Sequence, residues 1–406
     1  MPGEAGFFVR REKMPVSGLP PMHEWLVELR RHFHRYPEPA FGEEKTAAKI
    51  CEVLDALGVP HLREVGGTGV IAALGCRRPG GTLALRADMD ALPLDEAGDV
   101  PYGSLNPGMM HACGHDGHMT VALGVLRLLL ENDWPERGGG KVLFIFQPAE
   151  EGGRGGALAM LETGLFDPER IDAIFAVHMY PELPVGRIAL AATTSNAASD
   201  SISVRIVGKG GHGAHPELCV DPIVAGSYFV AQLQSIVSRS VPPLDSAVLT
   251  IGSFHGGTAR NIIPEEVRME GTLRTFRSQV RDLVLRRVEE AARGLESSHG
   301  VVVELKIDSG YPPVVNHPSV VEYVVDRARG LLGAESVLLE PPSMGAEDFA
   351  YFLQRWPGAL IRLGCHDPAK GFAHGLHSPH FDFDESALDV GVKLVADLLT
   401  HFAQTG

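Results

Sequence analysis

The spacing of apolar residues predicts alternating helices and strands over the first 190 residues. Apolar positions recur at helical spacing over residues 23–34, 43–57, 117–131 and 155–161. Between these helical segments lie short β-rich runs, which are GVIAAL from Gly69, TLALRA from Thr82, KVLFIFQ from Lys141 and DAIFAVH from Asp172. Such alternation is typical of an α/β sheet covered on both faces, which places its chemistry in loops beyond the strand ends.

The order of elements changes between residues 191 and 310. The pattern there predicts a strand, a helix, two strands, a helix and a strand, over residues 201–207, 221–238, 247–254, 266–276, 278–295 and 301–307. This β-α-β-β-α-β order is typical of a ferredoxin-like domain. After it, we expect helices following Pro318 and from Ala346, a strand over 359–363 and a helix over 385–402. The sequence therefore predicts a discontinuous α/β domain (1–190 and 311–406) interrupted by an α+β domain (191–310).

Composition and charge exclude several classes of partner. Of the 406 residues, 36 are Lys or Arg and 51 are Asp or Glu, so the net charge of −15 argues against a nucleic-acid partner. The run VALGVLRLLL is interrupted by Arg127 and is shorter than the roughly 18 residues of a membrane span. The N-terminus lacks the apolar core of a signal peptide. Five cysteines, an odd number, favour a reducing compartment. We expect a soluble, cytoplasmic protein.

The densest group of metal-ligand residue types is MHACGHDGH, which contains His111, Cys113, His115, Asp116 and His118. Thiolate and imidazole are ligands that borderline-soft divalent metals select. An acidic neighbour such as Asp116 can orient a histidine ring through its second nitrogen. The alternative interpretation is a polar helix cap with one buried thiol. The motif predicts a metal site only if distant residues complete it.

Further candidate residues lie at the ends of predicted strands. In QPAEEGG, Glu150 and Glu151 follow a strand, and adjacent side chains in extended chain point to opposite sides. One carboxylate can then bind a metal while the other acts as a general base, although an exposed acidic turn is the alternative. Other polar residues share this placement at strand ends, namely Asp88, Asp90, His178 and His377. A single histidine is more often structural, but their joint placement favours a site.

Motifs for other chemistries are absent or incomplete. GKGGHG over residues 208–213 matches a dinucleotide-binding loop, but Pro216 follows closely and Gln232 occupies the position of the expected ribose-binding acid. We interpret it as a tight turn that presents His212. The sequence contains no phosphate-binding loop, serine nucleophile elbow or H-E-x-x-H helix, so phosphoryl transfer and serine hydrolysis have no motif support.

The motifs together resemble a known enzyme family. They are RADMDALP, MHACGHDGH, QPAEEGG, VHMYPELPVG, GKGGHGAHP, GGTARNIIPEE, GTLRTF, GAEDFAYF and LHSPHFDFDE. The chain is similar, from about residue 29 to its C-terminal helix, to the metal-dependent amidohydrolases that include hippurate hydrolase, aminoacylases and auxin-conjugate hydrolases. The resemblance implies a catalytic metal domain with an inserted lid and dimerisation domain, and the predicted order of elements agrees in giving one domain interrupted by another.

The resemblance implies roles for particular residues. It implies a centre of two divalent ions, manganese or zinc and alternatively cobalt, whose ligands are Cys113, His115, Glu151, His178 and His377, with the Cys113 thiolate placed to bridge. Glu150 becomes the general base, and Asp88, Asp90 and Asp116 would support the ligands. The resemblance also implies a homodimer or higher homo-oligomer formed through the lid, in which His212 reaches the partner's active site.

Two lid positions match those that hold the substrate in the family. Asn261 and Arg274 are associated there with the substrate carboxylate and the developing oxyanion. The sequence departs from the family pattern at Arg260, where proline is usual, and at Glu217, where histidine is usual. Both departures lie near the expected substrate pocket.

We therefore predict hydrolysis of the amide bond of small N-acyl amino acids, such as hippurate or N-acetyl amino acids. Two cations lower the pKa of a bridging water, and Glu150 accepts its proton. A carboxypeptidase or dipeptidase acting on short peptides is the close alternative, because it needs the same centre. A thiol hydrolase with Cys113 as nucleophile leaves the second glutamate unexplained. A non-catalytic metal-bound peptide receptor is disfavoured because no ligand or base position is lost.

Overall fold

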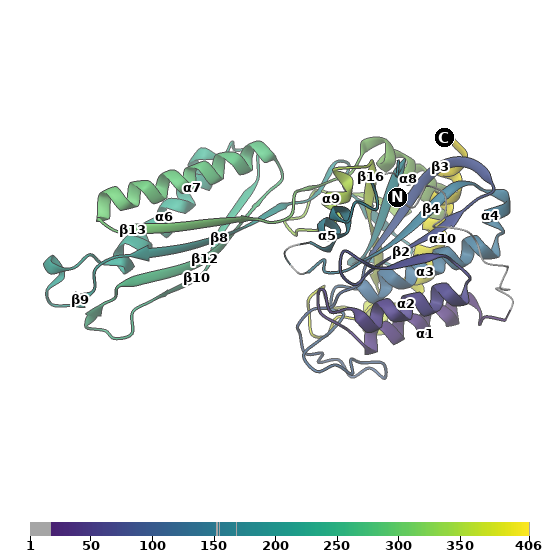
Figure 1. Ribbon diagram of the computed structural model, residues 1–406, viewed down its shortest axis with the longest axis horizontal. Coiled ribbons are helices and arrows are strands. Elements are labelled where there is room, and N and C mark those ends of the chain that lie inside the picture. Colours follow the sequence, from purple (N-terminus) through teal and green to yellow (C-terminus); the bar gives the residue numbers. More distant parts are fainter. Residues whose placement is uncertain (1–17, 152, 154, 168, 406) are drawn as a thin grey trace, which may run out of the picture. The chain divides into compact units, whose positions relative to one another are not determined.

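A computed structural model of the protein describes residues 18–151, 153, 155–167 and 169–405 (Figure 1). The N-terminal segment, for which the sequence predicts no signal peptide, lies outside the described residues up to residue 17. The chain forms two compact units. The large unit comprises Met1–Ser195, Val315–Pro341 and Asp348–Gly406, and the small unit comprises Asn196–Val314 and Pro342–Glu347. The short strands β7 (Thr194–Asn196) and β14 (Val314–Val315) contain two of the points where the chain passes between the units.

The large unit is built on an eight-stranded sheet in the order β1-β2-β4-β3-β5-β16-β6-β15. Its strands are β1 (His61–Val65), β2 (Gly69–Gly75), β3 (Arg78–Asp88), β4 (Gly139–Gln147), β5 (Ala173–Pro184), β6 (Ile188–Leu190), β15 (Val337–Leu339) and β16 (Gly358–His366). The four central strands, β4, β3, β5 and β16, run parallel to one another. The prediction of a mixed α/β fold is confirmed.

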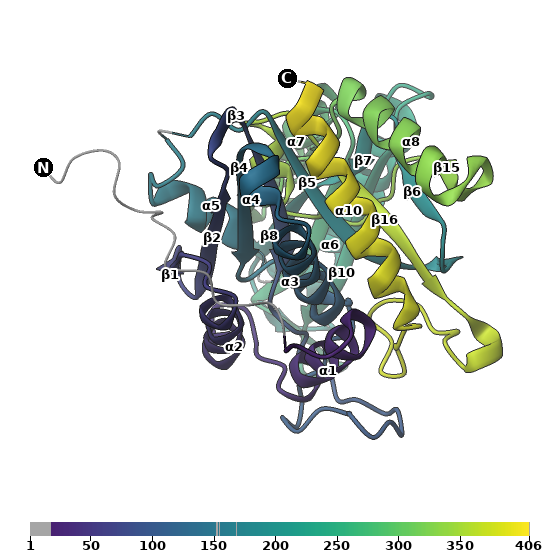
Figure 2. The same ribbon diagram turned by 90° about the vertical axis from the view of Figure 1, so that its right-hand side faces the viewer.

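Helices cover both faces of this sheet. They are α1 (Met22–Arg35), α2 (Glu44–Ala56), α3 (His115–Glu131), α4 (Trp134–Arg137), α5 (Gly156–Glu162), α8 (Pro318–Leu332), α9 (Ala350–Leu353) and α10 (Ser386–Thr405), with the 3-10 turns η2 (Ala334–Ser336) and η3 (Pro368–Lys370). Helix α3 packs between α1 and α10 (Figure 2). Because both faces are covered, the central strands read as continuous apolar runs, and all residues from Val142 to Phe146 are buried.

The small unit has the predicted ferredoxin-like order. Its elements are β8 (Ala198–Val207), β9 (Gly211–His212), η1 (Pro216–Leu218), α6 (Pro222–Ser240), β10 (Ala247–Gly256), β11 (Ile262–Ile263), β12 (Glu266–Thr275), α7 (Ser278–His299) and β13 (Val302–Ser309). The antiparallel sheet has the order β10-β12-β8-β13, and α6 and α7 pack on it around a separate core.

The structure differs from the sequence-based expectation mainly in short elements. Strands β1, β6 and β15 were not predicted, because strands of three to five residues carry too few positions to establish a period. Helix α9 begins at Ala350 rather than Ala346. Just before it, Asp348 accepts the N–H of Ala157 at 3.0 Å, so a tertiary contact fixes the start of this segment. Among the described residues, no helix is long and apolar enough to cross a membrane.

Candidate metal centre

Most of the residues predicted to form the site lie together at the carboxyl edge of the four central strands. Asp88 ends β3, Glu150 and Glu151 follow β4, His178 lies in β5, and His377 follows β16. The strand register aligns these ends, since Asp88 pairs with Gln147 and His178 with Arg362. Parallel strands end on the same edge of a sheet, so residues far apart in sequence meet there.

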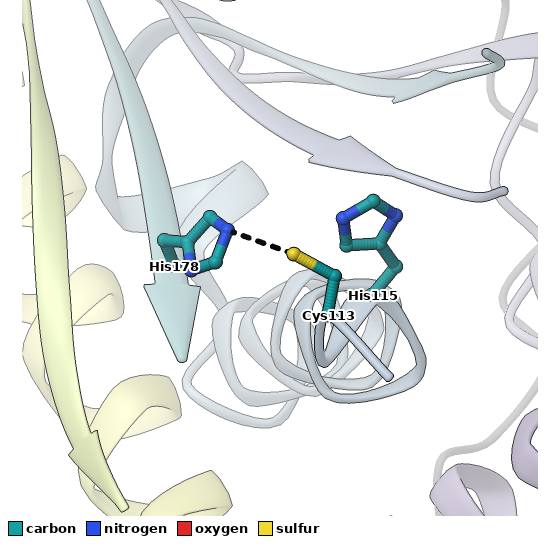
Figure 3. Close-up of side chains that lie close together, drawn as sticks. All are labelled: Cys113, His115 and His178. Carbon is teal, nitrogen blue, oxygen red and sulfur yellow. Dashed lines mark hydrogen bonds between the residues drawn. The ribbon is translucent and has the colours of Figure 1, made fainter. Parts of the chain in front are cut away.

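Cys113 and His115 reach the same edge from the start of α3. Between them, Gly114 adopts a left-handed φ of 83°, and a Cβ at this position would lie 2.8 Å from the Cβ of Met179. Only glycine fits this turn without strain. Figure 3 shows the side chains of Cys113, His115 and His178 pointing toward one another, with the Cys113 Sγ 3.6 Å from Nε2 of His178.

The thiol of Cys113 belongs to two groups of metal-ligand atoms. One group joins it to His115 and His178, and the other joins it to Glu151 and His377, with the ligand atoms of each group within 4.8 Å of one another. If each group held an ion, the shared thiolate would contact both ions. The donors, which are sulfur, imidazole nitrogen and carboxylate oxygen, suit a borderline-soft divalent metal.

The surroundings of Cys113 favour its thiolate. Burial opposes ionisation of this thiol, but the nearby imidazoles of His178, His115 and His377 outweigh it and lower its pKa to about 6. Reciprocally, Cys113 and Glu151 raise the pKa of His377 to about 10. In this set, positive imidazoles balance a thiolate and a carboxylate. A bound cation would balance these negative charges in place of the imidazole protons, because a metal ligand must be deprotonated.

His115, which is buried, and His178, which is partly buried, each present one nitrogen to the centre. His115 donates from Nδ1 to the carbonyl oxygen of Asp90 at 2.8 Å, and His178 donates from Nδ1 to the carbonyl oxygen of Met179 at 2.8 Å. This use of the second ring nitrogen is the usual arrangement of a metal-binding histidine. Nε2 of His115 is fully buried and has no hydrogen-bond partner among the described residues. A buried polar atom of this kind requires a partner, and a metal ion fits.

The adjacent glutamates are held by a third carboxylate. Asp90 accepts the backbone N–H of Glu150 at 3.0 Å and that of Glu151 at 2.9 Å. Both glutamates lie within ligand distance of His115, and Glu150 is 6% exposed. Glu151 alone belongs to the group that also contains Cys113 and His377. The two carboxylates therefore differ in their contacts, as the sequence pattern predicts for a ligand and a base.

Asp88 supports the site through a histidine to which sequence reasoning gave no role. His118 accepts the backbone N–H of Met179 at Nε2, so its proton is on Nδ1, which donates to Asp88 at 2.6 Å. His118 thereby ties the end of β3 to the residue that follows His178. The sequence did contain a signal for this role, because residues three apart on a helix lie on the same face and His118 follows His115 by three.

The side chain of Asp116 forms hydrogen bonds with residues of α1 and not with the predicted ligands. Its carboxylate accepts from Arg30 Nε at 2.8 Å and pairs with Nδ1 of His34 at 2.8 Å. Although Asp116 is buried, which disfavours its charge, Arg30 and His34 hold its pKa well below the usual range. The first histidine of the motif, His111, is also buried, and burial lowers its pKa to about 3. The contacts of Asp116 with Arg30 and His34 join α1 to the start of α3.

We expect Asp116→Asn to destabilise the protein by about 3 kcal/mol, because it leaves the buried Arg30 guanidinium without its closest buried counter-charge. The native-state pKa of Asp116 is depressed, so this stability is present above about pH 4 and is lost as pH falls below that value. Urea unfolding at several pH values measures both effects. Glu52→Gln, which removes an exposed ion pair, is the control and should cost less than about 0.5 kcal/mol. A fall in metal affinity without a loss of stability would instead support an orienting role for Asp116.

The predicted substrate residues lie in the small unit. His212 in β9 pairs with Ile262 in β11, and the carbonyl oxygen of the neighbouring Asn261 accepts the N–H of Gly213 at 2.9 Å. His212 and Asn261 are therefore brought together, both exposed, on one short ladder. Arg274 lies on β12, where burial lowers its pKa. Arg260 and Glu217, the departures from the expected pattern, are exposed.

Comparison with known proteins places the chain in a family of metal-dependent hydrolases. The model of peptidase family M20/M25/M40 matches residues 84–401. An N-acetyldiaminopimelate deacetylase of Brevibacillus brevis is 39% identical over 93% of this chain and 98% of its own. An N-acetyl-L-cysteine deacetylase of Bacillus subtilis is 39% identical over 94% and 88% of the respective chains. A Bacillus subtilis crystal structure, described as a dinuclear metal-binding peptidase of the M20 family, matches with a TM-score of 0.81 at 33% identity over 95% of this chain and 99% of its own.

Proposed function

The chain belongs to peptidase family M20/M25/M40 and is a hydrolase of amide bonds with sites for two divalent metal ions, and from this premise we propose that it removes the acyl group from N-acyl amino acids. The observation that carries the proposal is the position of Cys113 between two groups of ligand atoms, with a second carboxylate, Glu150, beside them. The relatives named as deacetylases of N-acetylated amino acids support this substrate class.

We assign the ligands to Cys113, His115, Glu151, His178 and His377. When bound, the two ions supply an activated water and polarise the scissile carbonyl. Glu150 takes the proton from the attacking water and returns it to the leaving amide nitrogen. Because the carboxylate is buried beside the ligands, it can serve both steps without exchange with bulk solvent. Asp90 fixes this carboxylate through the backbone, and Asp88 supports β5 through His118.

The small unit supplies the substrate contacts in this proposal. Arg274 binds the terminal carboxylate, since a guanidinium group forms a planar two-pronged contact with it. His212 and Asn261 donate to the oxyanion that develops on the scissile carbonyl. The mixed thiolate, imidazole and carboxylate donors admit manganese, zinc or cobalt, and availability decides among them. We also place the enzyme in the cytoplasm, because all five of its cysteines are free thiols.

A substrate panel tests the proposed activity. We expect the purified protein, loaded with Mn²⁺, Zn²⁺ or Co²⁺, to hydrolyse N-acetyl amino acids or hippurate faster than dipeptides, because two of its similar relatives are named as deacetylases of N-acetylated amino acids. Released amine is measured by fluorescent derivatisation. Turnover of dipeptides alone would assign the chain to the peptidase branch of the family. Absence of hydrolysis across the panel, with tight binding of one member, would assign it a receptor role.

We further propose that two copies pair through the small unit. The strand β10 is an edge of its sheet, and α6 beside it exposes Val224 and Tyr228, which lie one turn apart and are 47% and 63% exposed. An unpaired edge next to apolar side chains is a surface suited to a second copy. In the pair, His212 would complete the partner's site.

Tyr228→Arg should therefore convert a dimer into a monomer and lower turnover, as measured by light scattering after gel filtration and by hydrolysis. Leu244→Arg is the matched control, because Leu244 is fully exposed but lies beyond α6. We expect it to leave the molar mass unchanged. A wild-type protein that elutes as a monomer and turns over normally would contradict the proposed pairing.

A further inference from the structure

A buried glutamate from the N-terminal part of the chain contacts the turn that carries the proposed base. Glu43, the residue before α2, is 0% exposed. Its Oε1 accepts the backbone N–H of Ala149 at 2.8 Å, and its other oxygen accepts from the hydroxyl of Thr68. Ala149 directly precedes Glu150. The contact joins residues 106 positions apart in the sequence.

The turn at Ala149 adopts a conformation that its own sequence does not favour. Ala149 has a φ of 51°, in the left-handed region that residues with a Cβ rarely adopt. The turn is also tight, because a Cβ on Gly156 would lie 1.7 Å from the carbonyl oxygen of Pro148. Such a conformation persists only where surrounding contacts hold it. The carbonyl oxygen of Ala149 accepts from Gly156 at 3.0 Å, and its N–H is held by Glu43.

Two carboxylates together fix three consecutive backbone N–H groups. Glu43 accepts from Ala149, and Asp90 accepts from Glu150 and Glu151. The Asp90 contacts alone leave the left-handed residue before Glu150 without a partner for its N–H. If Ala149 relaxed to a right-handed or extended conformation, the chain direction entering Glu150 would change and the carboxylate would move away from its position beside His115.

We propose that Glu43 is a positioning residue for Glu150, acting through the backbone of Ala149. The inference rests on the proposed function, because it takes Glu150 as the general base. Glu43 itself does not touch the ligand atoms in this assignment. Its side chain is long enough to place an acceptor oxygen beside the backbone N–H of Ala149. Its effect therefore depends on the length of the side chain more than on its charge.

Two substitutions separate length from charge. Glu43→Gln keeps the length and an acceptor oxygen but removes the charge, whereas Glu43→Asp keeps the charge and is one methylene too short to reach Ala149. We expect Glu43→Asp to lower kcat by about 30- to 100-fold with KM and metal content unchanged, because a small misplacement of a catalytic group costs about that much. Glu43→Gln should restore kcat to near the wild-type value. An aspartate variant as active as the glutamine variant would overturn the proposal.

Glu38 provides a matched control for shortening a buried glutamate by one methylene. It is 8% exposed, and its carboxylate accepts the N–H groups of Lys45 and Thr46 and the Thr46 hydroxyl instead of the N–H groups of the turn. Glu38→Asp should lower the unfolding temperature as Glu43→Asp does, yet leave kcat unchanged when assayed well below that temperature. Equal losses of kcat in both variants would mean that Glu43 is only structural.

Hydrogen exchange distinguishes failure of this inference from failure of the proposed function. In metal-free protein, the amides of residues 149–151 should exchange faster in Glu43→Asp than in wild type or Glu38→Asp, whatever reaction the enzyme catalyses. Unchanged exchange there would overturn the role of Glu43. Faster exchange with no hydrolysis of acyl amino acids by the wild-type protein would leave the positioning contact intact and refute the proposed activity instead.

Discussion

Glu150→Gln is expected to lower turnover of N-acyl amino acids by about 10²- to 10⁴-fold while the protein keeps two metal ions. The amide has the shape of the carboxylate but cannot accept a proton from water or pass it to the leaving nitrogen. The side chain is 6% exposed, so bulk buffer has little access to replace it as the base. Steady-state kinetics and metal analysis of the same preparation measure the two quantities.

The neighbouring glutamate gives the sharpest comparison. Glu151 belongs with Cys113 and His377 to one ligand group, so Glu151→Gln should weaken metal binding first and lose activity as a consequence. Excess metal should partly restore the Glu151 variant by mass action and should not restore the Glu150 variant. Near-normal turnover by Glu150→Gln would refute its assignment as the base, and an exchange of the two phenotypes would reverse the roles of the two residues.

Sequence reasoning predicted that these residues gather at one edge because parallel strands align their carboxyl ends. The apolar runs ending at Asp88 and Gln147 gave the ends of β3 and β4, and a doubly covered sheet then requires the following polar residues to meet. Glu150, Glu151 and His178 follow from this rule without knowledge of the tertiary structure. The same rule does not say which nitrogen of a histidine faces the centre, because that depends on backbone carbonyls such as those of Asp90 and Met179.

Residues that act through the backbone could not be found in this way. Glu43 has the pattern of a helix start, and its carboxylate reaches Ala149 only because the start of α2 lies beside the turn after β4 in the folded chain. Asp116, in contrast, was predicted to support the metal ligands and contacts other residues instead. Its place among three histidines predicted an orienting contact, but the first turn of α3 directs its side chain to Arg30 and His34 on α1. Periodicity records which face is apolar and not which partner a buried polar group finds.

Cys113→Ala is expected to remove the one donor that the two ligand groups share, and so to weaken binding of both ions. The loss should exceed the roughly 10- to 100-fold that removal of an outer partner costs. Metal content after dialysis against buffered metal measures it, and in Co²⁺-loaded protein the thiolate-to-cobalt absorption should disappear. Cys51→Ala is the matched control, because Cys51 is also buried but lies in α2 among apolar side chains. It should lower stability and leave both ions bound.

The same variant separates the metal hydrolase from a thiol hydrolase, in which Cys113 would attack the substrate itself. A ligand that is lost weakens affinity, so raising the free metal concentration should recover part of the turnover of Cys113→Ala. A nucleophile that is lost cannot be replaced by metal, because the covalent step no longer has an attacking atom. Recovery with added Zn²⁺ or Mn²⁺ supports the shared-ligand role. Full metal occupancy with no turnover at any metal concentration would make Cys113 the nucleophile, and the pair of ligand groups around it would then need another explanation.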